Sequence, residues 1–198
     1  MQASALSSTD DIAERYLKRA ISEMNDLGSE IAKKAGPEAA HVLGSGHPLA
    51  DIFMLKYTPQ PAELQEGVAF FGRAGKAILK SLQRLRVDPT AIYGTNVTKL
   101  AEAELADAQA WIEREIHIVQ PKVIVVMGDE ARAFTNELKF PLASPIDADM
   151  GVLQQWTPTS QSLVSPDIDE SLDEQETKRA FWEAFKALGP WWAEQPPY

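Results

Sequence analysis

The stretch KVIVVM at residues 122–127, followed by Gly128, indicates the fold class of this chain. Five consecutive apolar residues without polar alternation are typical of a strand that is buried on both faces of a parallel sheet. Pro121 ends the preceding segment, residues 102–119, whose apolar residues recur every three or four positions as in an amphipathic helix. A helix followed by a buried strand is the repeating unit of α/β domains.

The same alternation continues on both sides of this strand. The pattern predicts three more strands, at residues 51–57, 91–97 and 152–157, the last of them the weakest. Helices are predicted between and after them, at residues 72–86, 130–138 and 172–188. Parallel strands joined through helices require right-handed crossovers. We therefore expect an α/β protein, a three-layer α/β/α domain around a central parallel four-stranded sheet.

The two ends of the chain differ from this pattern. Residues 1–35 are predicted to form an amphipathic helical extension packed on the domain, capped near Ser8 or Thr9 and ended at Gly28. The α/β domain is assigned to residues 36–190. Residues 191–198 form a tail, in which Trp191 and Trp192 are expected to pack as a clasp.

The composition of the chain limits the metal and cofactor sites that it can hold and indicates where the protein is located. The chain has 198 residues and no cysteine, so it can hold neither a thiolate zinc site nor a cysteine-bound iron–sulfur cluster. No histidine has a partner at metal-ligand spacing, and we expect no cofactor and no metal. Neither a secretory signal nor a run of 18–20 apolar residues is present. The prediction is a cytoplasmic monomer without membrane contact.

The charge of the chain is unevenly distributed. The net charge is −10, which opposes non-specific attraction to phosphate backbones. Between residues 73 and 99, however, six basic residues face one acid, a local balance of +5. This segment is either an anion-facing surface or a solvated helix face, and composition alone favours the second interpretation.

Four segments at the predicted strand ends carry a resemblance to a known family. They are GSGHPLADIFMLKYTPQP (residues 44–61), EGVAFFGRAGKAIL (66–79), AIYGTNVTKL (91–100) and IEREIHIVQPKVIVVMGDEA (112–131). In this order and spacing they resemble the uracil-DNA glycosylase superfamily, most closely its bacterial and archaeal family 4 type, over about residues 42–190. The resemblance implies an α/β/α fold and hydrolysis of the N-glycosidic bond of uracil or another deaminated base in DNA.

The resemblance also implies how the base is recognised. Uracil must leave the base stack and be read in a pocket. Phe70 would stack on the extruded base, and the Asn96 amide would match the carbonyl and ring N–H pattern of uracil. If DNA is the partner, we expect Arg73, Lys76 and Lys99 to lie near the pocket mouth as contacts to its backbone.

The chain departs from the family at the catalytic positions. Tyr57 stands where the family has an acidic residue that positions water, and a phenol is a poor general base at neutral pH. Ser165, in Ser-Pro-Asp, stands where the family has a histidine that stabilises the departing base. A replacement acid would be Asp167, Glu63 or Glu66.

Two hypotheses follow from these departures. The first is an atypical DNA glycosylase with weak or altered activity, in which Tyr57, Ser165 and Asp167 take the catalytic positions and Phe70 and Asn96 bind the base. The second is a non-catalytic relative that binds DNA, a free base or nucleotide, or a protein partner. The net charge and the altered Tyr57 and Ser165 favour the second hypothesis, whereas Asn96, Phe70 and the basic segment favour the first.

Overall fold

The computed structural model describes residues 2–100 and 103–196. The described strands are β1 (Ser45–Gly46), β2 (Ile52–Lys56), β3 (Ile92–Asn96), β4 (Val123–Met127), β5 (Leu153–Thr157) and β6 (Ser160–Ser165). The described α-helices are α1 (Gln2–Ala35), α2 (Pro61–Glu66), α3 (Arg73–Leu85), α4 (Leu105–Val119), α5 (Asp129–Asn136), α6 (Ile168–Asp173), α7 (Gln175–Phe185) and α8 (Leu188–Ala193). A 3₁₀ turn at Pro89–Ala91 precedes β3.

The strands form one mixed sheet in the order β1-β3-β2-β4-β6-β5. Its four central strands are parallel, which confirms the α/β class, but antiparallel edge strands bring the described sheet to six strands rather than four. Residues 152–157 do not supply the fourth parallel strand: β5 pairs antiparallel with β6, and β6 takes that place. The reason is that two residues separate β5 from β6, enough for a hairpin but not for a crossover.

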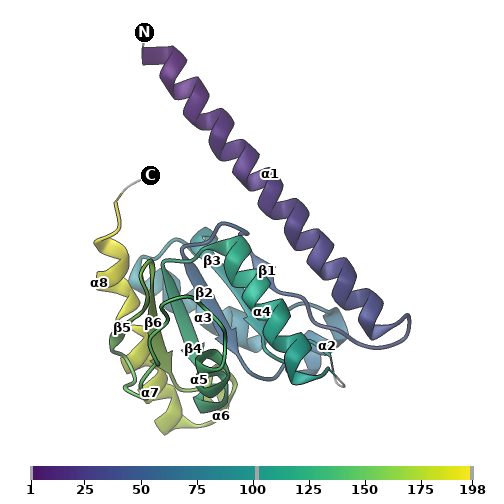
Figure 1. Ribbon diagram of the computed structural model, residues 1–198. Helices are drawn as coiled ribbons and strands as arrows, with labels where there is room; N and C mark the ends of the chain where they lie inside the picture. Colours follow the sequence, from purple (N-terminus) through teal and green to yellow (C-terminus); the bar gives the residue numbers. More distant parts are fainter. Residues whose placement is uncertain (1, 101–102, 197–198) are drawn as a thin grey trace.

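Helices cover both faces of the sheet, as Figure 1 shows. One apolar core lies between the sheet and α4 and α5, and a second lies between the sheet and α3, α6, α7 and α8. Every residue of β4 is buried, and Val125 has no exposed surface. The apolar run that predicted a strand buried on both faces is therefore the centre of both cores.

Two helix boundaries differ from the prediction. The predicted helix at residues 172–188 is interrupted at Glu174, which is extended (φ −113°, ψ 124°) and separates α6 from α7. The first helix does not end at Gly28 but runs from Gln2 to Ala35, before Gly36 with φ +86°. Gly28 instead allows close packing, because a Cβ atom there would lie 3.2 Å from Leu43 Cδ1.

The C-terminal part of α1 packs against α4, while its N-terminal part extends beyond the sheet (Figure 1). Leu27 and Ile31 of α1 form a small apolar cluster with Leu100 and Trp111. At the other end of the chain, Trp191 is buried in α8, and its indole N–H donates to Gln161 Oε1 at 2.8 Å. Within the described residues, no helix is long and apolar enough to cross a membrane.

Candidate functional site

Four residues at the carboxyl ends of the parallel strands stand in one row. The register pairs Asn96 with Lys56, Lys56 with Met127, and Met127 with Ser165. All four side chains are buried. Because neighbouring strands lie about 4.8 Å apart, Asn96 and Ser165 are separated by roughly 14 Å, three strand spacings. Asn96 and Lys56 are therefore direct neighbours, whereas Ser165 stands at the far end of the row.

Lys56 is the charged centre of the site. Its ammonium lies 2.5 Å from Glu63 Oε2 and 2.6 Å from Asp169 Oδ2. Lys56 and Glu63 have no exposed surface, and the Asp169 side chain is 13% exposed. Sequence reasoning missed Lys56. The available signal was a lysine at the end of an apolar strand, because a buried ammonium requires a carboxylate partner. The two partners come from α2 and α6, on opposite sides of β2.

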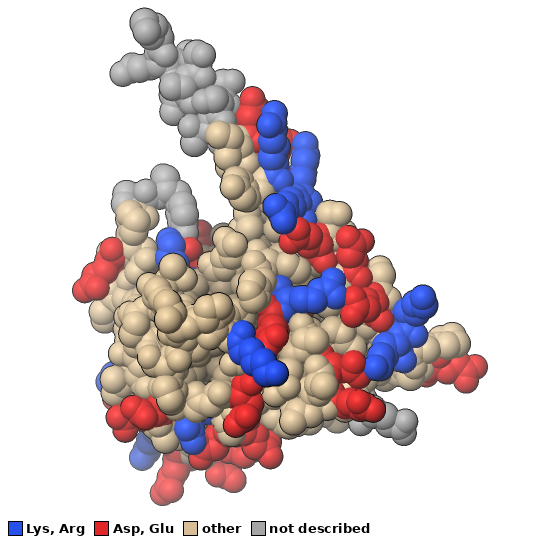
Figure 2. Space-filling model, viewed as in Figure 1, with Lys and Arg blue, Asp and Glu red and all other residues tan. Residues whose placement is uncertain are grey.

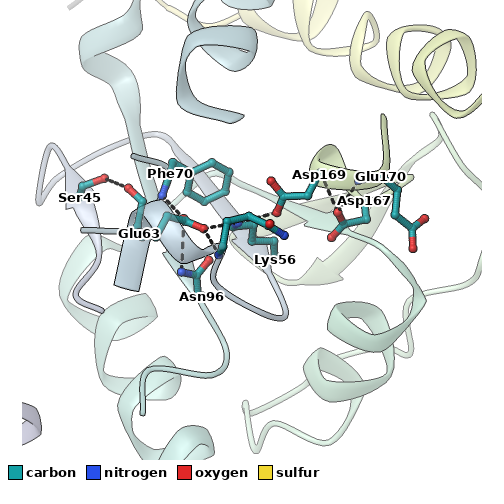
Figure 3. A network of polar contacts seen from close by, with 10 residues as sticks. Ser45, Lys56, Glu63, Phe70, Asn96, Asp167, Asp169 and Glu170 are labelled. Carbon is teal, nitrogen blue, oxygen red and sulfur yellow. Dashed lines mark hydrogen bonds and ion pairs between the residues drawn. The ribbon is translucent and has the colours of Figure 1, made fainter. Parts of the chain in front are cut away.

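Glu63 connects Lys56 to the predicted base-binding residues. Its Oε1 atom accepts hydrogen bonds from the Phe70 backbone N–H and from Asn96 Nδ2, the latter at 3.5 Å. Its Oε2 atom accepts from the Gln60 backbone N–H at 2.6 Å as well as from Lys56. A carboxylate only accepts hydrogen bonds, so it fixes the orientation of the Asn96 amide. Asn96 Oδ1 is left buried without a protein partner among the described residues (Figure 3).

Phe70 is held in an unusual backbone conformation above β3. Its φ angle is +59°, in the left-handed region that non-glycine residues seldom occupy. Gly94 of β3 provides the space for the ring, since a Cβ atom there would lie 2.7 Å from Phe70 Cδ2. The Lys56 ammonium lies 5.6 Å from the centre of the ring, within cation–π range (Figure 3). The structure thus brings Phe70, Asn96, Glu63 and Lys56 together.

The predicted catalytic residues Tyr57 and Ser165 are engaged elsewhere. Tyr57 is partly buried, and its ring meets Phe134 edge-on, with 6.4 Å between ring centres. The Ser165 hydroxyl has no exposed surface and donates to the Pro166 carbonyl oxygen at 3.1 Å. Neither side chain contributes to the hydrogen bonds and ion pairs that surround Glu63.

Asp167 lies beside this network, at the start of α6. Its Oδ1 atom caps the helix by accepting the backbone N–H groups of Asp169 and Glu170 at 2.7 and 3.2 Å. Burial raises the pKa of Asp167 above its ordinary value, although the two backbone hydrogen bonds oppose this shift. Asp167 and Tyr57 border a cavity of about 590 Å³ that is also lined by the acids Asp129, Glu130, Glu170 and Glu176.

The three cations expected at the pocket mouth have different environments. Lys99 does not lie there: it is fully buried on the other face of the sheet, where its ammonium donates to Thr95 Oγ1 and, at 2.9 Å, to Glu115 Oε1. Burial lowers the pKa of Lys99. Arg73 and Lys76 are exposed at the start of α3, and Arg73 pairs with Asp173 at 2.6 Å.

Charge on the face drawn in Figure 2 is mixed rather than segregated. On the face drawn in Figure 2, basic and acidic side chains alternate, and no continuous basic patch is present there. Glu66, at the end of α2, is exposed. Among the described residues no group of three His, Cys, Asp or Glu side chains is arranged to hold a metal ion.

Comparison with known proteins identifies the family and a relative. The family model described as "Uracil DNA glycosylase superfamily" matches residues 43–188, which include Glu63 and its partners Lys56, Phe70 and Asn96. A type-4 uracil-DNA glycosylase of Sulfurisphaera tokodaii is 31% identical over 96 residues, which cover 44% of this chain and 44% of the relative. The chain therefore matches less than half the length of this curated relative.

Proposed function

This chain belongs to the uracil DNA glycosylase superfamily, and on that premise we propose that it recognises uracil or another deaminated base in DNA and hydrolyses its N-glycosidic bond weakly. The observation that carries the proposal is the convergence of Phe70 and Asn96 on one carboxylate, Glu63. An extruded base needs an aromatic face to stack on and a polar group to read its edge. The ring of Phe70 and the amide of Asn96 supply these two elements within one hydrogen-bonded unit.

The environments of Tyr57 and Ser165 support the weakness of the hydrolysis. Cleavage requires stabilisation of the departing base anion and a water molecule directed at the sugar. The Ser165 hydroxyl is neutral and already donates to a carbonyl oxygen, and the Tyr57 phenol is a poor base at neutral pH. Loss of one preorganised donor costs about 2.7–4 kcal/mol, or roughly 10²–10³ in rate. We expect uracil excision far below that of relatives with an acid and a histidine.

Asp167 is our proposed replacement for the missing acid. Its raised pKa brings it nearer to the range in which a carboxylate accepts a proton at neutral pH. It borders the same cavity as Tyr57. The other two carboxylates are less suitable, because Glu63 is already bonded to Lys56 and Glu66 is exposed at the end of α2.

The proposed DNA contacts are reduced to Arg73 and Lys76, because Lys99 is buried. Both exposed cations belong to the first turn of α3, which begins three residues after Phe70. The net charge of −10 and the acidic cavity beside Tyr57 oppose the approach of phosphates. We therefore expect weak binding to DNA that falls only modestly as the salt concentration rises, because two phosphate contacts release few counterions. A cytoplasmic location and a monomeric state stay predictions from the sequence.

A second candidate function is binding without catalysis. It is favoured by the complete burial of Lys56, Glu63 and Asn96, since a base cannot contact the Asn96 amide while these side chains keep their positions. Such a relative would bind DNA, a free base or nucleotide, or a protein partner, either at another surface or at this site once these side chains move. Salt dependence separates the first two, because binding of a free neutral base releases no counterions.

The experiment is an excision assay on single- and double-stranded oligonucleotides that contain one uracil, followed by alkaline cleavage at abasic sites. We expect slow cleavage by the unaltered protein, none by Asn96→Ala, and faster cleavage by Tyr57→Glu combined with Ser165→His. The control is Lys186→Ala, which removes an exposed ion pair with Glu183 at the C-terminal end of α7 and should match the unaltered protein. Absence of cleavage in all variants, with uracil-dependent binding retained, would instead support the non-catalytic relative.

A further inference from the structure

The groups that would bind the base already have an occupant in the chain. The Phe70 N–H and Asn96 Nδ2 both donate to Glu63 Oε1, and the Lys56 ammonium lies over the Phe70 ring. A base stacked on Phe70 and bonded to Asn96 would need the same volume and the same donors. Glu63 and Lys56 together therefore fill the position of the base's polar edge and ring.

This occupancy leaves one polar atom unsatisfied. Asn96 Oδ1 has no hydrogen-bond partner among the described residues, although it is buried. A buried acceptor without a donor is unfavourable. A base that presents an N–H group beside a carbonyl oxygen would satisfy Asn96 Oδ1 and Asn96 Nδ2 at once, whereas Glu63 satisfies Nδ2 alone. The Asn96 amide therefore makes fewer of its hydrogen bonds in the closed arrangement than it would with such a base.

The segment that carries Glu63 is attached in a way that permits its release. Glu63 is the single buried residue of the six in α2, so polar contacts rather than apolar packing attach this helix to the sheet. Gly67, with φ +71°, ends the helix. The residues after it are anchored, because Ala69 N–H donates to the Leu43 carbonyl and Ser45 Oγ donates to the Ala69 carbonyl, each at 2.8 Å. Gly67 is therefore where α2 meets the anchored segment, and a turn of α2 at this glycine would break the hydrogen bond from the Val68 N–H to the Glu63 carbonyl oxygen, at 3.2 Å.

We propose that Glu63 and Lys56 form an internal plug that closes the base pocket and is displaced when a base enters. The proposal rests on the function proposed above and adds how access to that site is controlled. On displacement, α2 turns about Gly67 and withdraws the Glu63 carboxylate, and the Lys56 ammonium moves off the Phe70 ring while it stays paired with Asp169. The apparent affinity for a base is then lowered by the small fraction of molecules that are open.

The closure can be measured without any base, because the chain has no cysteine. Asn96→Cys places a single thiol at the pocket, and its rate of reaction with a thiol-specific reagent reports access. In the background of Lys56→Gly with Glu63→Ala, which removes the plug, we expect this rate to rise about tenfold or more. Equal rates with and without the plug would overturn the proposal.

A matched control separates opening from general loosening of the fold. Lys99→Met with Glu115→Gln removes another buried lysine–glutamate pair, on the opposite face of the sheet. In the Asn96→Cys protein this change should leave thiol reactivity within about twofold of the plugged form. If the control raises reactivity as much as removal of the plug does, the protection of residue 96 is a property of overall stability and the proposal fails.

Base binding then distinguishes this proposal from the proposed function. With Asn96 intact, removal of the plug should strengthen binding to a uracil-containing oligonucleotide about tenfold or more. Binding to the counterpart that contains neither uracil nor thymine should not gain in this way, and Asn96→Ala should abolish the gain. Faster thiol labelling without uracil-dependent binding would uphold the plug and refute the function. Uracil-dependent binding that is equally tight with and without the plug would uphold the function and refute the plug.

Discussion

The buried pair of Lys99 and Glu115 allows a quantitative prediction about stability. Glu115 is 2% exposed, and its Oε1 atom accepts from the Lys99 ammonium and from the Tyr93 hydroxyl, each at 2.9 Å. Its Oε2 atom has no partner among the described residues. Lys99→Met removes the ammonium but keeps most of the side-chain volume. A buried carboxylate without its countercharge costs about 3–5 kcal/mol, a large share of the 5–15 kcal/mol by which domains are usually stable.

Equilibrium unfolding in urea at pH 7 measures this loss. Lys99→Met should lower the free energy of unfolding by about 3–5 kcal/mol, and Glu115→Gln in the same chain should restore most of it, because no buried charge then remains. Lys122→Met removes the lysine of a partly exposed pair with Asp51 and should cost less than about 1 kcal/mol. A loss of less than about 1 kcal/mol for Lys99→Met would refute the reasoning, since Glu115 would then need no countercharge.

Three further predictions concern single residues. Gly94→Ala should abolish uracil-dependent binding in a folded protein, because the new methyl group would displace the Phe70 ring, and a binding titration with a circular dichroism spectrum checks it. Gly46→Ala should lower the unfolding midpoint, because the residue has φ +121° and its Cβ atom would lie 2.3 Å from the Ile92 carbonyl oxygen; a midpoint equal to the unaltered protein's would contradict this. Burial raises the pKa of Asp167 above 3.8, so the folded protein binds this proton more tightly than the unfolded chain does. The resulting contribution to the free energy of unfolding is complete below pH 3.8 and is lost as the pH rises through the raised pKa. Asp167→Asn keeps a good helix cap and should therefore be more stable than the unaltered protein at pH 7 but not below pH 3.8, as urea unfolding at both pH values would show.

The candidate site was predictable in part. Phe70 and Asn96 could be assigned because both lie in segments whose residue order resembles the family, and the structure brings both to Glu63. The sequence suggests Glu63 only as a replacement catalytic acid. Its role as the shared partner of Phe70, Asn96 and Lys56 depends on the path of α2, a short helix whose polar sequence does not predict a buried face.

Local patterns in the sequence were sufficient for the α/β class and for the central strand β4. Apolar runs and helical spacing act over a few residues, so they can be read without knowledge of partners. The sheet edges required more, because β5 pairs antiparallel through a hairpin that a weak strand pattern does not specify. The separate helices α6 and α7 likewise depend on the extended conformation of Glu174.

The environments of the lysines were decided by the tertiary structure alone. Lys56 ends a strand and meets Asp169, 113 residues later in the chain. Lys99, which belongs to a basic segment in the sequence, is buried against Glu115 instead of facing solvent. The sequence specifies the charge of each side chain, but whether that charge is solvated or paired depends on which carboxylates folding brings within a few ångströms of it.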